Sequence, residues 1–334
     1  MLRRILSFFL FFFLWVNILS AQVEDSKLAF FEPADTFHQG RFWTSLSIGT
    51  AAYGAMVYGL STAWYAESEQ SPFHFFNDWG EWRHVDKVGH AMTAYNYTST
   101  GFTGARWIGI NRRKALWTSA AVSFGMQATI EVLDGFADKW GFSMPDIAFN
   151  SLGIGVFVGQ ELAWQEQRIV MKVSNTFPSY PNNIVTSADG FHTTTLDQRA
   201  RDLYGTSFFD RFFKDYNGQV NWLSFNIHSF TKKKDNKFPK WLNVAIGYGA
   251  GNLYEGFPDY SWVDVDTGIR FERDSNEFPR HSRIFLSFDI DTARLPIKNR
   301  FLKTLIGGLN FIKIPSPTLE FTTLGDVKFH GLYF

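Results

Sequence analysis

Three pairs of polar residues, made of acids, one histidine and one amide, have helical spacing within residues 84–161. Their side chains could do chemistry. A separation of three or four residues places two side chains on one face of a helix. The spacing therefore allows a single polar cluster between packed helices. The pairs are Asp86 with His90, Glu131 with Asp134, and Asp146 with Asn150.

Two kinds of chemistry would suit such a cluster. A histidine with carboxylates can bind a divalent ion, and the candidate metal ligands are His90, Asp86 and Asp146. A desolvated carboxylate or an imidazole can act as an acid or a base, which adds Glu131 to these three as a candidate catalytic residue. Further candidates for a bound ligand or a polar network are Tyr97, Asp134 and Asn150.

The cluster can also be explained without any ligand, and we favour this interpretation. Asp86 and Asp146 stand where helices are expected to begin, so each carboxylate can accept hydrogen bonds from free N–H groups. His90 and Asn150 can hydrogen-bond across a bundle. Neither H-x-x-x-H nor H-E-x-x-H spacing occurs. The cofactor is therefore unknown, and a divalent metal is an option that is not favoured over a structural network.

Composition narrows the function classes. The chain has 334 residues, enough for about two domains, and its 32 basic and 32 acidic residues give no electrostatic footprint for nucleic acid. It contains no cysteine, which excludes disulfides, thiolate metal sites and a lipid-bearing cysteine. No Walker, Rossmann, G-x-S-x-G or EF-hand pattern occurs, so nucleotide binding is not expected. The aromatic fraction of 18% fits either a large core or a membrane interface.

The first residues predict export. Residues 1–21 have the features of a signal peptide, with Arg3 and Arg4 before a short apolar run and Ala21 at the cleavage position. Residues 22–42 are expected to form a lead-in segment. Residues 43–165 are expected to form a bundle of about four helices rich in small residues. Its first segment, Trp43 to Trp64, has no charged residue and at 22 residues could span a bilayer.

The remainder of the chain has strand periodicity. Residues 166–215 are expected to form a loop-rich connector with a short helix near 196–203, and residues 216–334 an antiparallel β region. Apolar residues alternate with polar or small ones near 223–227, 242–248 and 284–290, which predicts strands with one buried face. Asp289 and Asp291 share a strand face that we interpret as solvated. The predicted class is α+β, with a curved sheet favoured over a small or partial barrel.

Several short motifs of the helical region resemble a known family. D-K-x-x-H at Asp86–His90, the later Glu131, and S-x-x-D-x-x-x-N-x-x-G at Ser143–Gly153 resemble the VanZ-like superfamily and look closest to its YfiM-like branch. That resemblance covers roughly residues 43–164. It implies a periplasmic or outer-membrane protein of unknown function. The chain departs from the pattern because Asp134 stands where a Gln is usual.

Two functions follow from these observations. The first is a non-enzymatic protein of the cell envelope that binds membrane lipid or another envelope protein, with a structural or ligand-binding polar cluster. The alternative is a membrane-adjacent enzyme that acts on lipid or cell-wall precursors through His90 and the neighbouring carboxylates. Either function places the protein in the periplasm or outer membrane of a Gram-negative cell.

Overall fold

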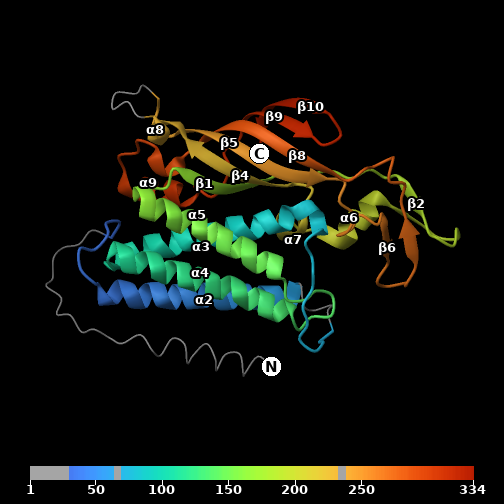
Figure 1. Ribbon diagram of the computed structural model, residues 1–334, viewed down its shortest axis with the longest axis horizontal. Coiled ribbons are helices and arrows are strands. Elements are labelled where there is room, and N and C mark those ends of the chain that lie inside the picture. Colours follow the sequence, from blue (N-terminus) through green and yellow to red (C-terminus); the bar gives the residue numbers. More distant parts are fainter. Residues whose placement is uncertain (1–29, 64–68, 232–237) are drawn as a thin grey trace.

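The computed structural model describes residues 30–63, 69–231 and 238–334. The predicted signal peptide and the first part of the lead-in segment lie outside these ranges. Within them, the chain forms a layer of long helices with an antiparallel sheet lying across it (Figure 1). The predicted α+β class, a helical bundle followed by an antiparallel sheet, is therefore confirmed.

Four long helices form the first layer, and local sequence sets their ends. α5 begins as predicted, because Ser143 Oγ accepts a hydrogen bond from the Asp146 amide at 3.0 Å. α3 ends at Gly109, where φ is 93° and an added Cβ would lie 1.9 Å from the Thr36 carbonyl oxygen. The four helices are α2 (Gln39–Ala63), α3 (Val85–Ile108), α4 (Arg112–Asp134) and α5 (Met144–Trp164).

Six strands form the main sheet, in the order β1-β4-β5-β8-β9-β10, with every neighbouring pair antiparallel. β1 was not predicted from the sequence, and its residue Val173 also forms a bridge to Ile312 on the side away from β4. The strands are β1 (Ile169–Asn175), β4 (Gln219–Asn226), β5 (Leu242–Gly251), β8 (His281–Ile290), β9 (Ser316–Thr322) and β10 (Val327–Tyr333).

Smaller elements complete the part of the chain that the structure describes. α6, β2 and β6 extend beyond one end of the main sheet (Figure 1). α6 matches the short helix predicted near 196–203. These elements are η1 (Glu81–His84), β2 (Ile184–Thr186), β3 (Thr193–Thr195), α6 (Leu196–Tyr204), α7 (Phe208–Lys214), α8 (Ile227–Phe230), β6 (Ser261–Val263), β7 (Arg270–Glu272), η2 (Thr292–Arg294) and α9 (Arg300–Gly308).

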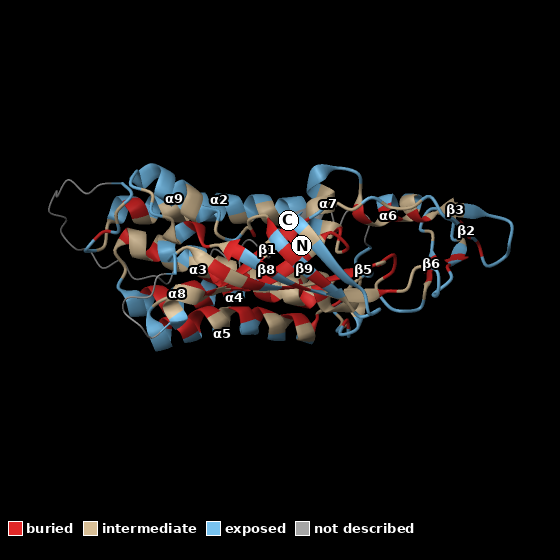
Figure 2. Cartoon of the chain, turned by 90° about the horizontal axis from the view of Figure 1, so that it is seen from above, coloured by how far each residue is buried: buried red, intermediate tan, exposed pale blue. Residues whose placement is uncertain are grey.

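The main hydrophobic core lies between the two layers. Tyr95 of α3 and Phe157 of α5 pack edge to face, with ring centroids 5.6 Å apart. Leu116 of α4 and Met171 of β1 belong to the same buried cluster. Figure 2 shows buried residues gathering where α3, β1 and β8 overlap. The helices that carry the predicted polar cluster are therefore held in place by the sheet.

The strands have the predicted alternation, but the apolar face is the exposed one. Ile246, Leu286 and Phe288 are 45–54% exposed, whereas Phe285, the neighbour of Leu286 on β8, is fully buried. The interior of the curved sheet holds small and polar side chains together with Trp222. The expectation that the apolar residues of these strands face the core is wrong, because large aromatic rings and an ion pair already fill the interior.

That ion pair corrects a second expectation. Asp289 and Asp291 are buried rather than solvated, at 0% and 2% exposure. Asp289 accepts a hydrogen bond from Ser224 at 2.6 Å and lies 2.7 Å from the ammonium of the buried Lys172. Asp291 is paired with Arg294 at 2.9 Å. Two buried carboxylates are tolerated here because each has a cation and a hydrogen-bond donor.

α2 forms where the uncharged segment Trp43 to Trp64 predicts a helix. Across residues 30–63, 69–231 and 238–334, however, no helix combines the length and the hydropathy that a bilayer crossing requires. The suggestion that this segment could span a bilayer is corrected accordingly. Its Gly, Ser and Thr residues lower its mean hydropathy.

Candidate functional site

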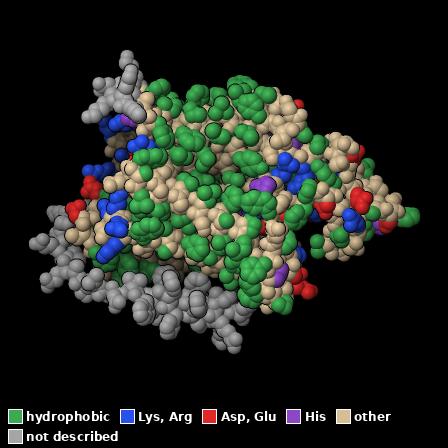
Figure 3. Space-filling view, in the orientation of Figure 1, with side chains coloured by type: hydrophobic (Ala, Val, Ile, Leu, Met, Phe, Trp, Pro, Cys, Tyr) green, Lys and Arg blue, Asp and Glu red, His purple; other side chains and the backbone are tan. Residues whose placement is uncertain are grey.

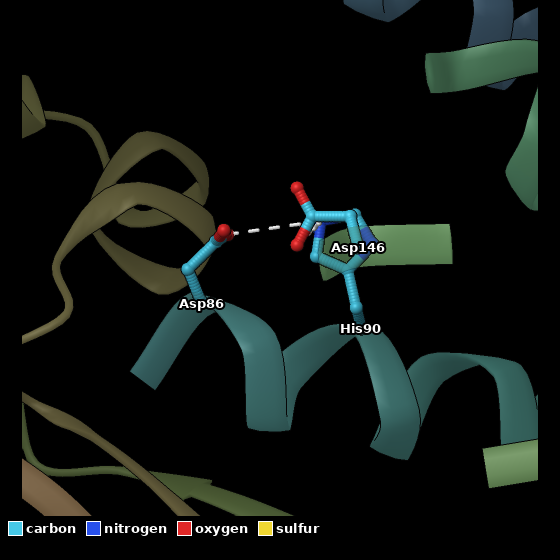
Figure 4. Close-up of side chains that lie close together, drawn as sticks. All are labelled: Asp86, His90 and Asp146. Atoms are coloured by element: carbon cyan, nitrogen blue, oxygen red, sulfur yellow. Dashed lines mark ion pairs between the residues drawn. The ribbon is translucent and has the colours of Figure 1, made fainter. Parts of the chain in front are cut away.

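The candidate site lies where three helices of the bundle meet. Asp86 and His90 occupy successive turns at the start of α3, Glu131 lies in the last turn of α4, and Asp146 lies in the first turn of α5. In Figure 4, Asp86 and His90 project from α3 toward Asp146. The convergence that helical spacing allowed is therefore present in the structure.

A glycine lets α3 and α5 approach closely enough to build this site. A Cβ added at Gly153 would lie only 1.9 Å from the carbonyl oxygen of Ala91, the residue after His90. Asn150, one turn before Gly153, then reaches His90. Gly155 and Gly159, which are spaced four apart on the same helix, have no atom within 4 Å of an added Cβ.

Lys87 occupies the centre of the cluster. Its side chain is fully buried, and its ammonium nitrogen lies 2.9 Å from Asp86 Oδ2 and 2.7 Å from Asp146 Oδ1. It also contacts Asp78, whose other oxygen accepts a hydrogen bond from Ser143 at 2.7 Å. Sequence reasoning missed Lys87 and Asp78, although Lys87 is the second residue of the D-K-x-x-H motif.

His90 faces acceptors on both sides of its ring. Nδ1 lies 3.2 Å from Asn150 Oδ1 and 3.6 Å from Glu131 Oε1. Nε2 lies 3.8 Å from both Asp86 Oδ1 and Asp146 Oδ1. The side chains of His90 and Asp86 are 20% and 19% exposed, so the site has some access to solvent. The ring is therefore surrounded by oxygen atoms.

Burial and like charges shift the protonation of this cluster. Burial raises the pKa of Glu131 to about 8 and that of Asp146 to about 7, despite the opposing effect of His90. Burial alone would lower the pKa of His90, but the carboxylates around it leave that pKa raised. Burial also opposes ionisation of Asp86, yet His90 and Lys87 keep its pKa lowered. Such clustered shifts are typical of functional sites, though structural ion pairs produce them too.

Two buried polar atoms of the cluster have no hydrogen-bond partner among the described residues. They are Glu131 Oε1 and Asn150 Nδ2, in residues with 1% and 0% exposure. Asp146 Oδ1 also accepts no hydrogen bond of regular geometry, although it is paired with Lys87. Buried polar groups without partners are costly, so they point to a group that the protein atoms do not supply.

The ligand atoms of three residues are close enough to share a metal ion. One atom each from Asp86, His90 and Asp146 lie within 4.8 Å of one another. Imidazole and carboxylate donors suit a divalent transition metal. The same atoms could equally transfer protons, since a histidine beside a carboxylate is the usual acid–base pair.

Two predicted site residues lie at or beyond the edge of the cluster, and a third participant, besides Lys87 and Asp78, was missed. The Tyr97 hydroxyl donates to Met56 Sδ of α2 at 3.3 Å, away from His90. Asp134 ends α4, and its charge contributes to the raised pKa of Glu131. Tyr216, from the loop before β4, donates to Asp86 Oδ1 at 3.0 Å. No spacing in the sequence links Tyr216 to this site.

Comparison with known proteins matches the same region. Residues 75–159 match the model of a family described as predicted periplasmic lipoprotein (DUF2279). No curated protein and no solved structure matches the chain. The matched range contains every member of the cluster except Tyr216, and it supports an exported location in the cell envelope. The 334 residues contain no cysteine that could carry a lipid.

Proposed function

We propose that this exported envelope protein associates with a lipid surface, that of the outer membrane, through the exposed apolar face of its sheet. The main observation behind the proposal is the orientation of β5 and β8, whose apolar faces point away from the core. Their outward side chains are largely aliphatic or aromatic, and the inward Asp289 of β8 forms a buried ion pair with Lys172 of β1. We also propose that the resemblance to the YfiM-like branch and the predicted signal peptide are genuine, as the periplasmic family match supports.

Lipid is a better occupant for this face than a second copy of the chain. A symmetric dimer would cover one patch on each subunit. Exposed apolar side chains occur on the helical layer as well, and Figure 3 shows hydrophobic side chains over both layers. A lipid environment that contacts several faces of the protein accounts for the exposed apolar side chains of both layers. The exposed residues of the helices include Ile48, Tyr58, Trp117, Phe124, Leu152 and Leu162.

α9 adds a local feature suited to a membrane interface. Phe301, Leu302 and Leu305 are 44–55% exposed on this short helix. Lys298 and Lys303 beside them are exposed as well. Apolar side chains flanked by lysines favour the boundary between acyl chains and anionic headgroups. We therefore expect binding to be stronger on anionic than on zwitterionic vesicles.

Flotation with phosphatidylglycerol vesicles tests the proposal. Ile246 and Leu286 are paired across β5 and β8, so Ile246→Lys with Leu286→Glu places opposite charges side by side and preserves the sheet. Each buried aliphatic side chain contributes about 1.5–3 kcal/mol. The double variant should therefore lower vesicle partitioning at least about tenfold.

The control makes the same change elsewhere. Val263→Lys with Val265→Glu alters two exposed valines, at 54% and 78% exposure, near β6. This control should float like the unchanged protein. The proposal is wrong if the unchanged protein stays with the unbound fraction. If light scattering shows that the unchanged protein is a dimer and that Ile246→Lys with Leu286→Glu is a monomer, the apolar face binds a second copy of the chain instead.

A second candidate function is a membrane-adjacent enzyme acting on lipid or cell-wall precursors. The observation in its favour is the partial exposure of His90 and Asp86 beside the buried Glu131. His90→Ala separates the candidates. An enzyme predicts a folded protein that still floats but no longer hydrolyses vesicle phospholipid. A purely structural cluster predicts that stability and flotation are lost together.

A further inference from the structure

We infer that Asp86, His90 and Asp146 form a binding site for one divalent transition-metal ion, of the kind represented by Zn²⁺ and Mn²⁺. The inference concerns the helical bundle and does not depend on whether the sheet binds lipid. It rests on geometry, on the orientation of the imidazole ring, on unpartnered buried atoms and on the balance of charge.

The distances fit ligands around an ion better than they fit hydrogen bonds. His90 Nε2 lies 3.8 Å from Asp86 Oδ1 and 3.8 Å from Asp146 Oδ1, which is too long for a hydrogen bond. Nitrogen and oxygen ligands bind Zn²⁺ at about 2.0–2.2 Å, so neighbouring ligand atoms lie roughly 3–3.5 Å apart. A contraction of about half an ångström would bring Nε2 to this spacing from each of the two carboxylate oxygens.

The contacts of the other ring nitrogen orient His90 for this role. Nδ1 faces Asn150 Oδ1 at 3.2 Å and Glu131 Oε1 at 3.6 Å, and both atoms are acceptors. With the Nδ1 proton facing these acceptors, Nε2 is the nitrogen left to bind an ion between the two carboxylate oxygens that it faces. Metal-bound histidines are usually held in this way, with the distal N–H donated to an amide or carboxylate oxygen.

Glu131 is the independent observation that points to a missing group. Its Oε1 atom is buried, accepts no hydrogen bond from the described residues, and is directed at His90. Its charged neighbour is His90, whose Nδ1 lies 3.6 Å away. Glu131 becomes useful once His90 donates Nδ1–H while binding a metal through Nε2, because it then strengthens the ligand and balances its charge.

The charges around the site also favour a further cation. Asp78, Asp86 and Asp146 lie around the ammonium of Lys87, and Glu131 faces His90. Four acidic groups thus share one lysine and one histidine in a largely buried space, so a divalent ion would stabilise the carboxylates in their charged form.

Lys87 does not occupy the proposed position. It binds Asp86 through Oδ2, whereas the atom facing His90 is Oδ1. It shares Asp146 Oδ1, but a carboxylate oxygen has a second lone pair for the ion. Tyr216 donates to Asp86 Oδ1 and holds this carboxylate in orientation. Lys87 and Tyr216 thus support the ligands from outside.

The test uses purified protein that has been freed of metal with a chelator. Titration with ZnCl₂ or MnCl₂ in a calorimeter should give one ion per chain. His90→Gln and Asp146→Asn should each weaken the affinity at least about 100-fold, and Tyr216→Phe about tenfold, as expected for ligands and for an outer partner. Added Co²⁺ should give a visible absorption spectrum in the unchanged protein, so the test does not depend on any variant folding.

His330→Gln is the matched control. His330 is also paired with a carboxylate, since Nε2 lies 2.6 Å from Glu320 Oε2, but the described residues place no third ligand beside this pair. This variant should bind metal like the unchanged protein. Absence of one-to-one binding by the unchanged protein would overturn the inference, and so would His90→Gln that stays folded by circular dichroism and binds equally well.

Discussion

Lys87 is the residue whose environment most constrains the candidate site. Its ammonium is fully buried and lies against Asp78, Asp86 and Asp146. Burying any one of these charges alone would be costly, and the cluster is stable only because the charges offset one another. The carboxylates attract the proton and keep the pKa of Lys87 raised, although burial opposes this. Lys87 therefore stays charged at neutral pH.

Replacing Lys87 should therefore be severe. Lys87→Met fills a similar volume but leaves three carboxylates without their cation, so we expect a loss of about 3–5 kcal/mol in the free energy of unfolding. Urea unfolding followed by circular dichroism measures it. Lys114→Met, on an exposed position of α4, should change stability by no more than about 0.5 kcal/mol. Equal stabilities for the two variants would contradict the proposed arrangement.

Helical spacing found part of this site and missed the rest for identifiable reasons. Asp86 and His90 were paired correctly because both lie on α3, one turn apart. Tyr97 lies on the same face of α3, but it is seven residues further along the helix and therefore about 10 Å beyond His90. Asp78 and Tyr216 come from non-helical segments, where no period indicates direction. Their contacts exist only once the loops are folded onto α3.

At the scale of elements, the contact between α3 and α5 controls the geometry of the site. Gly153 lies against the Ala91 carbonyl, so the two helix backbones touch directly beside His90. The sequence offered several glycines on α5 and no means of choosing among them. Gly155 and Gly159 have the spacing typical of helix contacts, yet both are exposed. A glycine allows a second helix to approach closely, but only the packed structure shows which glycine faces that helix.

Two alanine substitutions on α5 should therefore have opposite effects. Gly153→Ala forces the helices apart and should destabilise the protein by about 1–3 kcal/mol, as overpacking does. Gly155→Ala meets no atom within 4 Å and should be neutral or stabilising by up to about 1 kcal/mol, because alanine favours helix. Thermal unfolding of both variants checks this. A stable Gly153→Ala would mean that α3 and α5 are farther apart than described.

The strands illustrate a different limit of sequence reasoning. Alternation predicted β4, β5 and β8 correctly, since a period of two is a property of the backbone. It could not decide which face is buried. Trp222 and Phe285 fill the interior from positions between the aliphatic residues, and the Lys172–Asp289 pair completes it. Whether the apolar face of such a strand points inward or outward can be predicted only when the surroundings of the sheet are known.

At the scale of the whole molecule, hydrogen bonds join the two layers next to the candidate site. The Tyr95 hydroxyl of α3 donates to the Ile169 carbonyl of β1 at 3.1 Å. Tyr248 of β5 donates to the Arg83 carbonyl, in the left-handed turn before α3. Tyr216 reaches Asp86 itself. The start of α3 is thus fixed by the sheet, and we expect helices and sheet to unfold as one cooperative unit.

Hydrogen exchange can test this coupling with a variant that touches only the helices. If the layers form one unit, Gly153→Ala should reduce the protection of amides in β4 and β5 by the same free energy as in α3 and α5, although the atoms nearest to an added Cβ belong to Ala91 of α3. The reason is that strand amides in the core exchange through global unfolding, which the variant makes more frequent. Protection that falls in the helices and stays unchanged in β4 would show two independent units. The sheet would then not hold Asp86 and His90 in place, and the contact of Tyr216 with Asp86 would not stabilise the site.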